Sequence, residues 1–344
     1  MSKSKRILIL GSLPIENVPT TFGGATILMR SLKEYLDNNY SNHDFILLNN
    51  NTSSRIKSYF SVLKQFFKKI QNSDVVFINV SSNGAFYLSP LLYVAAKMFS
   101  KKVIFRIFGS NFEQIFKNKQ KIFRVIARRT FFNSNMVLVE TEINKKFFVG
   151  EGVESIDILP NVRKKQINFR LKENYERRFV FISHVKIKKG VLDIMKASEY
   201  MNKDYKIDLY GPVYDDLAPE DLNNDIVSYK GVLKPNEVLK TMNSYDVVLL
   251  PTFYEEEGQP GILIEAMSIG KPIISTFWNS IEEVVTDGYN GILVPIKSPE
   301  LIAKACIGFN TRNYNEMSQN ALERFKYFDE VLVYEKLIEK IEEM

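Results

Sequence analysis

The chain has 344 residues, 45% of them hydrophobic and 25% charged, and a formal net charge of +6. This length suits two globular domains, and the composition is near the globular average. The single cysteine, Cys306, excludes an intramolecular disulfide, and no apolar run reaches transmembrane length. The first residues lack the apolar core of a signal peptide. The sequence therefore predicts a cytoplasmic protein.

The charge is distributed unevenly along the chain. Residues 1–170 carry 26 Lys and Arg against 11 Asp and Glu, a net of +15, whereas residues 171–344 carry 20 against 29, a net of −9. Two domains of opposite sign suggest two kinds of ligand. The sign changes within the polar stretch 161–178, which we take as the interdomain linker. The predicted divisions are a first domain over 1–165, a second domain over 166–325 and a C-terminal helix over 326–344.

Apolar strand-like runs alternate with helical stretches in both halves. In the first half the predicted strands are Arg6–Gly11, Phe45–Leu48, Val75–Val80, Lys102–Phe108 and Met136–Glu140. In the second half they are Phe179–Ser183, Lys206–Tyr210, Ile226–Tyr229, Val247–Pro251, Ile273–Ser275 and Ile292–Val294. This alternation indicates α/β domains with parallel sheets. Ligands of such sheets bind at the carboxyl ends of the strands, so two Rossmann-like domains would share a cleft.

The stretch 252–272 is the most informative about function. It follows the last apolar residues of a predicted strand and continues into a short helix, which Gly270 and Pro272 end. We expect Pro260 as the first helical residue, where a missing N–H costs no hydrogen bond. The amides of Gly261 and Ile262 then point out of the helix start. They predict a site for an anion.

Two carboxylates flank this predicted anion site. Glu257 precedes the helix start, and Glu265 lies just inside the helix. Both would repel phosphate, so their placement makes sense if they hold hydroxyl groups on either side of a diphosphate. A nucleotide-sugar has that chemistry. The alternative is a helix preceded by a solvated acidic loop, which is how we interpret Glu255 and Glu256.

These two glutamates resemble the E-x7-E signature of retaining glycosyltransferases of family 4, which have the two-domain GT-B fold. The resemblance implies that Glu257 contacts the donor sugar and that Glu265 holds the nucleotide ribose. It also implies that the backbone between them faces the sugar and the phosphates, and that the last helix crosses back to the first domain. The donor-binding residues predicted in this segment are Gln259, Pro260, Gly261, Ile262 and Glu265.

The stretch 181–190 resembles the family's strand-loop-helix motif, whose Arg and Lys neutralise the donor diphosphate. Lys189, followed by Gly190, matches the lysine. His184 stands where the family usually has Arg, and an imidazole offers neither a permanent charge nor a bidentate fork. His184 could ionise beside a diphosphate, with a raised pKa, or it could be a packed residue. Lys186 or Lys188 could take its place.

Other loops match the family less specifically. Gly23 and Gly24 open a helix and resemble the glycine loop of the first domain. Gly211 and Val232 lie in loops that resemble those holding the base, although plain turns would have the same composition. The stretch 287–291 matches the family's closing turn. Trp278 and Asn279 stand where relatives often have Gly-Gly.

The sequence predicts no metal site and no required cofactor. It has no Asp-x-Asp pair, no Cys-x-x-Cys, and only two histidines. We therefore expect a retaining transfer of a sugar from a UDP-, GDP- or ADP-sugar to an acceptor hydroxyl in cell-surface polysaccharide or glycolipid synthesis, with Glu257, Lys189 and His184 as catalytic residues. The alternatives are a non-catalytic subunit with the same fold, or a sugar-nucleotide epimerase or phosphorylase.

The basic first half suggests where the enzyme works. Residues 55–69 and 116–129 interleave Lys and Arg with aromatic and aliphatic residues. Such helices can dock on an anionic membrane surface. The sequence therefore predicts a lipid-linked or saccharide acceptor and a peripheral position on the inner face of the membrane. A solvated basic surface is the alternative, and nucleic acid, the rival partner, lacks a recognition motif here.

Overall fold

The computed structural model describes residues 4–14, 24–48, 55–81, 84–172 and 174–344, without the side chains of 55–59. The chain divides into two compact units. The first contains residues up to Asn161 together with Glu330–Met344, and the second contains Val162–Asp329. The boundary between the two units, between Asn161 and Val162, thus lies at the start of the stretch 161–178. Each unit has one parallel six-stranded sheet.

The sheet of the first unit has the strand order β2-β1-β3-β4-β5-β6. Its strands are β1 (Ile7–Gly11), β2 (His43–Leu47), β3 (Val75–Ser81), β4 (Lys102–Phe108), β5 (Met136–Val139) and β6 (Ile156–Ile158). Its helices are α1 (Gly24–Asn39), α2 (Arg55–Ile70), α3 (Leu88–Met98), α4 (Phe112–Lys117), α5 (Lys121–Arg129), α6 (Glu142–Gly150) and α12 (Glu330–Glu343). Sequence reasoning missed β6, because three half-buried residues leave no periodic signal.

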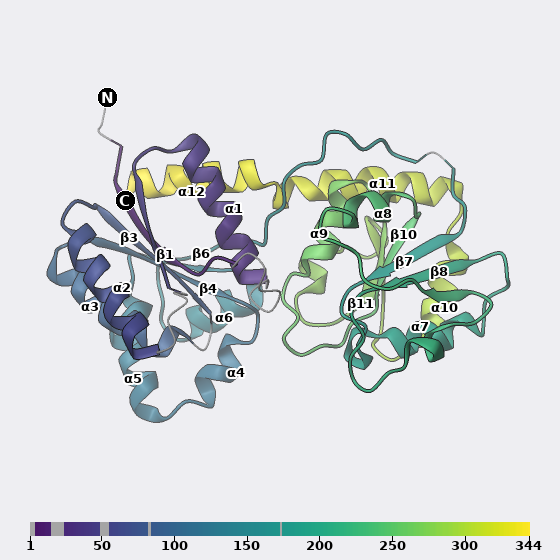
Figure 1. Ribbon diagram of the computed structural model, residues 1–344, viewed down its shortest axis with the longest axis horizontal. Coiled ribbons are helices and arrows are strands. Elements are labelled where there is room, and N and C mark those ends of the chain that lie inside the picture. The colour runs from purple at the N-terminus through teal and green to yellow at the C-terminus, as the bar shows by residue number, and fades with distance from the viewer. Residues whose placement is uncertain (1–3, 15–23, 49–54, 82–83, 173) are drawn as a thin grey trace. The chain divides into compact units, whose positions relative to one another are not determined.

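The helices of the first unit cover both faces of its sheet (Figure 1). The connection from β1 to β2 runs one way along the sheet, and the connections from β2 through β6 run the other way. Because parallel crossovers are right-handed, α1 lies on one face, and α2, α3, α5 and α6 lie on the opposite face. This second group forms one layer whose outer surface is turned away from the sheet.

Helix α12 packs on the first unit beside α1, as the family resemblance implies. Tyr334 and Tyr35 have ring centroids 5.3 Å apart, and the Ser31 hydroxyl donates to Glu330 at 2.6 Å. At the other end of the helix, the Lys5 ammonium donates to the carbonyl of Glu342 at 2.6 Å. The last residues of the chain therefore complete the first unit.

The sheet of the second unit has the strand order β12-β11-β10-β7-β8-β9. Its strands are β7 (Arg178–Ile182), β8 (Lys206–Tyr210), β9 (Val227–Tyr229), β10 (Val247–Leu250), β11 (Ile273–Thr276) and β12 (Gly291–Val294). Its helices are α7 (Val191–Ser198), α8 (Val238–Asn243), α9 (Gly261–Ser268), α10 (Pro299–Gly308) and α11 (Thr311–Phe325). All six strands were predicted to within one residue at each end.

The strand order of the second sheet reverses between β7 and β10. The chain runs from β7 outward to β9, then returns to β10 on the other side of β7. At such a reversal the loops that follow the two central strands diverge and leave a crevice at the carboxyl end of the sheet. The loops after Ile182 and Leu250 leave the sheet here, and they carry most of the predicted site.

Among the described residues, no helix combines the length and the apolar character needed to cross a bilayer.

Candidate functional site

The two loops at the strand-order reversal are held together by close backbone packing. Gly190 has a φ of +83°, and a β-carbon built on it would lie 2.1 Å from the carbonyl oxygen of Pro251. Next to it, the amide of Phe253 donates to the carbonyl of Lys188 at 2.8 Å. A side chain at position 190 would push the loops apart. The glycine therefore places Lys189 beside the loop that follows β10.

Lys189 and Glu257 form an ion pair across this junction. Both side chains are mostly buried, with exposed fractions of 12% and 11%. The hydroxyl of Thr252 donates to the same Glu257 oxygen at 3.1 Å, and the Lys189 ammonium lies 5.0 Å from the centre of the Tyr254 ring. The predicted phosphate-binding lysine and the predicted sugar-binding glutamate are thus neighbours.

The second predicted glutamate also has a cationic partner, which sequence reasoning missed. The Arg163 guanidinium donates to Glu265 at 2.7 Å, and both side chains are largely buried. A β-carbon on Gly261 would lie 1.6 Å from Arg163 Nη2, so the guanidinium crosses directly over the first residue of α9. No sequence signal links two residues 102 positions apart, and we had assigned Arg163 to the linker.

The start of α9 differs in detail from the expectation. Pro260 is the N-cap, with φ −63° and ψ 119°, and Gly261 is the first helical residue. Pro260 has the extended geometry typical of an N-cap, and its carbonyl accepts the amides of Leu263 and Ile264. Its ring nitrogen has no proton to donate. The amides of Gly261 and Ile262 have no acceptor within the helix. Arg163 thus places a positive charge at an end of the helix that is already electropositive.

The loop that carries Glu257 is fixed by two residues that depart from the family pattern. The indole N–H of Trp278 donates to the carbonyl of Tyr254 at 2.9 Å. The Asn279 side-chain amide donates to the carbonyls of Glu255 at 3.1 Å and Glu257 at 3.3 Å. These hydrogen bonds hold the backbone of the loop from Tyr254 to Glu257 in place.

His184 lies at the end of β7 with an exposed side chain, and its ring centroid is 5.1 Å from that of Tyr214. Partial desolvation lowers the pKa of His184, and the nearby charges of Lys186 and Lys189 lower it further. This direction is opposite to the raised pKa expected beside a diphosphate. The surroundings of His184 in this structure therefore favour its neutral form.

The two lysines considered as substitutes for the family's Arg have different surroundings. The Lys186 ammonium lies 4.5 Å from the centre of the Tyr214 ring and 5.9 Å from that of Tyr254, close to the junction of the two loops. Lys188 pairs with Glu255 at 2.7 Å, and both of these side chains are about half exposed. Lys186 is the better placed of the two.

The remaining predicted donor contacts surround these loops. Gln259 is buried and donates to Glu283 at 3.1 Å. A β-carbon on Gly211 would lie 1.7 Å from the carbonyl oxygen of Ser183. The backbone of the loop after β8 therefore packs directly against that of the loop after β7. Val232, with an exposed fraction of 65%, lies free at the surface of the next loop. All three belong to the second unit.

The predicted glycine loop of the first unit falls largely outside the described residues. Gly24 is the first residue of α1 and is exposed, whereas Gly23 is not described. Across the described part of the chain, no group of three or more His, Cys, Asp or Glu side chains could hold a metal ion.

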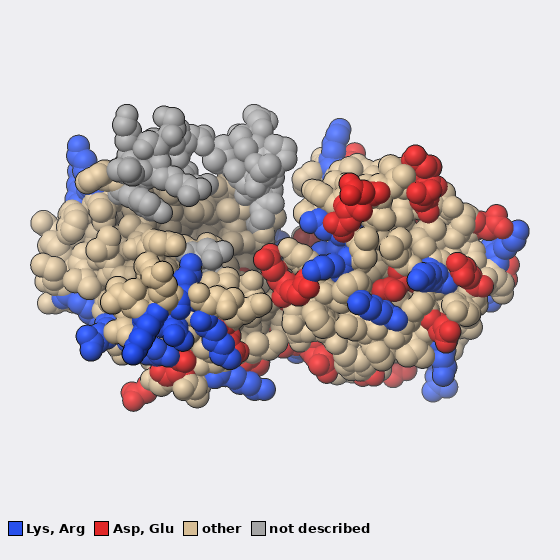
Figure 2. Space-filling view, turned by 90° about the horizontal axis from the view of Figure 1, so that it is seen from below, with Lys and Arg blue, Asp and Glu red and all other residues tan. Residues whose placement is uncertain are grey.

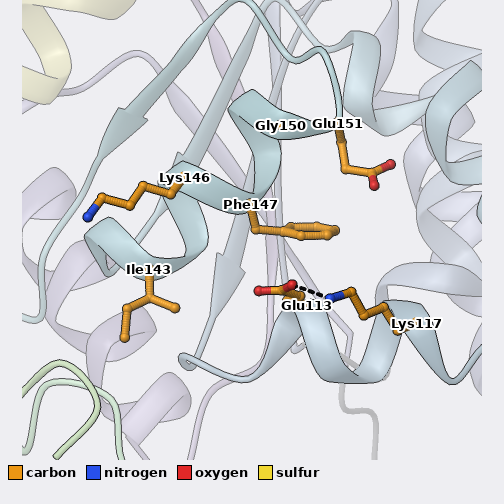
Figure 3. Close-up of a pocket in the computed structure, with 7 residues that line it drawn as sticks. All are labelled: Glu113, Lys117, Ile143, Lys146, Phe147, Gly150 and Glu151. Carbon is orange, nitrogen blue, oxygen red and sulfur yellow. Dashed lines mark hydrogen bonds and ion pairs between the residues drawn. The ribbon is translucent and has the colours of Figure 1, made fainter.

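The first unit also has a surface pocket of about 490 Å³ between α4 and α6. Glu113 and Lys117 on α4 form an ion pair at 2.5 Å below the ring of Phe147 on α6 (Figure 3). None of the residues that line this pocket is among the predicted site residues.

Known proteins resemble the chain in both sequence and fold. Residues 176–310 match a family described as "Glycosyl transferases group 1". An uncharacterized glycosyltransferase of Methanocaldococcus jannaschii is 28% identical over 295 residues, which are 76% of this chain and 75% of that protein. A putative colanic acid biosynthesis glycosyltransferase of Salmonella typhimurium, WcaL, is 31% identical over 97 residues, 27% of this chain and 24% of its own.

Among solved structures, Anabaena HepE in complex with UDP and glucose has a TM-score of 0.71 at 14% identity, over 99% of this chain and 100% of that one. A sucrose-phosphate synthase of Thermosynechococcus elongatus has a TM-score of 0.72 at the same identity, over 98% and 99%. The chain has the GT-B fold. The matches in sequence support a glycosyltransferase family for it.

The packing of Gly190 can be tested against a matched glycine. Gly288 has a similar φ of +72°, but a β-carbon there would meet no atom within 4 Å. We expect Gly288→Ala to lower the free energy of unfolding by about 1–2 kcal/mol through backbone strain alone. Gly190→Ala should cost about 1–3 kcal/mol more through overpacking. Urea unfolding followed by circular dichroism measures both, and equal losses would contradict the close packing of the two loops.

Proposed function

We propose that the second unit binds a nucleoside-diphosphate sugar and that the protein transfers the sugar, with retention, to an acceptor hydroxyl. The observation that carries this is the pairing of each predicted glutamate with a largely buried cation at the strand-order reversal, Glu257 with Lys189 and Glu265 with Arg163. Two cations and a helix start suit a diphosphate, and the carboxylates beside them suit hydroxyls. Retention follows the resemblance in sequence.

Each residue then has a defined role toward the donor. Lys189 and Arg163 neutralise the diphosphate, together with the amides of Gly261 and Ile262, and stabilise the charge that develops on the leaving phosphate. Glu265 holds the ribose hydroxyls, and Glu257 contacts the sugar. Without a donor, the carboxylates neutralise the positive charges of Lys189 and Arg163. A bound diphosphate neutralises part of these charges instead, so each glutamate becomes available to accept hydrogen bonds from hydroxyls.

The acceptor side of the proposal rests on the first unit and on relatives. WcaL is named for colanic acid biosynthesis, and AmsK of Erwinia amylovora, 22% identical over 237 residues, for amylovoran biosynthesis. HepE was crystallised with UDP-glucose. We propose that this protein acts in polysaccharide or glycolipid synthesis, that the basic first unit binds a lipid-linked or saccharide acceptor, and that it does so at the inner face of a membrane.

The donor can be identified by incubating the purified protein with UDP-, GDP- and ADP-sugars. A glycosyltransferase without an acceptor slowly hydrolyses its own donor, so free nucleoside diphosphate should accumulate with one nucleotide and not with the others. An epimerase would give a new sugar on the same nucleotide. A non-catalytic subunit would release nothing from any donor, which is the result that would overturn the proposal.

The two glutamates should separate binding from turnover. Glu265→Ala should weaken nucleoside binding by about 1.5–3 kcal/mol, because the ribose loses a charged hydrogen-bond acceptor. Glu257→Ala should cut donor hydrolysis while leaving nucleoside diphosphate affinity nearly unchanged. Glu256→Ala is the control, since Glu256 lies in the same loop and is exposed. Calorimetry and the hydrolysis assay measure the two effects, and wild-type behaviour of both site variants would show that the roles are wrong.

The role of Arg163 can be tested by comparing the affinity of Arg163→Ala for a nucleoside diphosphate with its affinity for the nucleoside. If its guanidinium meets the phosphates, Arg163→Ala weakens nucleoside diphosphate binding by about 1.5–3 kcal/mol, since a charged hydrogen bond is lost, and weakens nucleoside binding less. If Arg163 only orients Glu265, both ligands lose affinity equally. Arg177→Ala provides the control, because Arg177 pairs with Asp204 at an exposed site of the same unit.

The contribution of His184 should depend on pH. Its pKa is lowered in the structure, and an adjacent diphosphate would raise it by favouring the imidazolium. Binding then takes up a proton, so affinity should increase as pH falls from the bound pKa toward the free pKa, by up to about tenfold for each unit between them. Above the bound pKa the affinity should be flat.

The measurement compares wild type with His184→Asn from pH 5.5 to 8. Taking the ratio of the two affinities removes the titration of the phosphate itself. A ratio that does not change with pH would exclude contact between a protonated His184 and the diphosphate.

A further inference from the structure

Helix α3 exposes a continuous apolar stripe. Its inward residues, which include Leu88 and Leu92, pack into the core of the first unit. On the opposite side, four apolar side chains recur at helical spacing with exposed fractions between 47% and 79%: Tyr87, Leu91, Val94 and Met98. A helix of a soluble domain normally presents polar residues on its outer side. A stripe of this kind marks an interaction surface.

The neighbouring helices extend the stripe into a surface. The Phe67 ring of α2 lies 6.2 Å from Phe99 at the end of α3, and Phe123 of α5 lies 5.9 Å from Tyr87 at its start. All three helices lie in the layer on the same face of the sheet. Exposed apolar side chains continue on both flanks, with Phe60 and Phe67 on α2 and Ile122 on α5. We call this outer surface of α2, α3 and α5 the apolar-basic face.

The three helices that form the apolar-basic face carry charged residues of one sign. Helices α2, α3 and α5 contain ten Lys and Arg residues and no Asp or Glu. Lys64 and Lys68 on α2, and Lys121 and Arg129 on α5, are exposed. Figure 2 shows Lys and Arg gathered on the first unit, on the side on which α5 lies in Figure 1.

Two cations predicted to act at a membrane have structural partners instead. Arg128 pairs with Glu151 at 2.6 Å, and Lys69 with Asp44 at 3.4 Å. Their replacement would disturb the fold as well as the surface. The test variants are therefore built on the exposed lysines of α2.

We propose that the apolar-basic face is the surface by which this protein docks on an anionic lipid bilayer. The cations face the headgroups, and Leu91, Val94 and Met98 enter the region between headgroups and acyl chains. A second copy of the chain that docked through the same face would bring the same positive charge and be repelled, and a nucleic acid would leave the apolar stripe in water. This docking rests on the proposed function, because it would bring the first unit to a lipid-linked acceptor in the membrane.

Vesicle flotation with phosphatidylcholine alone and with one quarter phosphatidylglycerol tests the proposal. Wild type should float only with the anionic vesicles and less so at high salt. Lys64→Glu with Lys68→Glu should reduce partitioning at least about twentyfold, since each lysine near such a surface contributes about fivefold. Leu91→Glu with Met98→Glu should also reduce it. The controls on the second unit are Lys304→Glu with Lys326→Glu, and Leu301→Glu with Ile307→Glu, all at exposed positions.

A second measurement reports insertion directly. The single native cysteine, Cys306, is buried, so a cysteine introduced at the surface can be labelled selectively. An environment-sensitive dye on Met98→Cys should shift its emission to the blue with anionic vesicles, whereas the same dye on Ile307→Cys should not. This readout is independent of stability changes in the glutamate variants.

The outcomes are distinct from those of the donor experiments, because vesicle binding is measured without nucleotide. Donor hydrolysis by Leu91→Glu with Met98→Glu should equal that of wild type. Protein that stays unbound to anionic vesicles at low salt, or a label at position 98 that does not shift, overturns the proposal. Sedimentation experiments test the alternative partner. A dimer that the double variant Leu91→Glu with Met98→Glu dissociates would show that this face binds a second copy of the chain instead of a bilayer.

Discussion

The contact of Gly190 with the carbonyl of Pro251 is the constraint on which the candidate site depends. Two central parallel strands place their following loops side by side at a reversal of strand order, but they do not by themselves decide how close the loops come. A residue without a side chain lets the two backbones touch. This places Lys189 beside Glu257, and both groups lose most of their contact with water. An ion pair is stronger in such an environment than in water.

The charges of the site are arranged in pairs, and this arrangement explains how a buried site can carry two carboxylates. An isolated buried carboxylate would be costly, and a cation at the start of a helix is unfavourable with respect to the helix dipole. The ion pair of Arg163 with Glu265 reduces both costs, because each charge is neutralised by the other. In the proposed function, each pair exchanges its partner for a ligand that offers both phosphates and hydroxyls.

The first unit combines two surfaces with different composition. One face of its sheet is covered by α1 and the returning helix α12, joined by buried tyrosines and a hydrogen bond to Glu330. The other is covered by α2, α3 and α5, which have no acidic residue and whose outward side chains are apolar at the centre. The inner sides of these helices pack on the core, and their outer sides form the apolar-basic face. Both are possible because residues at helical spacing can form separate apolar stripes on opposite sides of one helix.

The sequence by itself determined the alternation of strands and helices, the fold class and the presence of a helix that starts close to Pro260, because these depend on local periodicity, on proline and on glycine. It also indicated both glutamates and Lys189 as members of one candidate site. Only the tertiary structure decided their partners: Arg163 stands 102 residues from Glu265, and Trp278 and Asn279 meet the loop at Tyr254 across the ends of two strands. The stripe on α3 also needed the structure, since apolar residues recur on both sides of that helix and the sequence cannot tell which side meets the sheet. Contacts between distant segments have no periodic signal, which is why the sequence could not supply them.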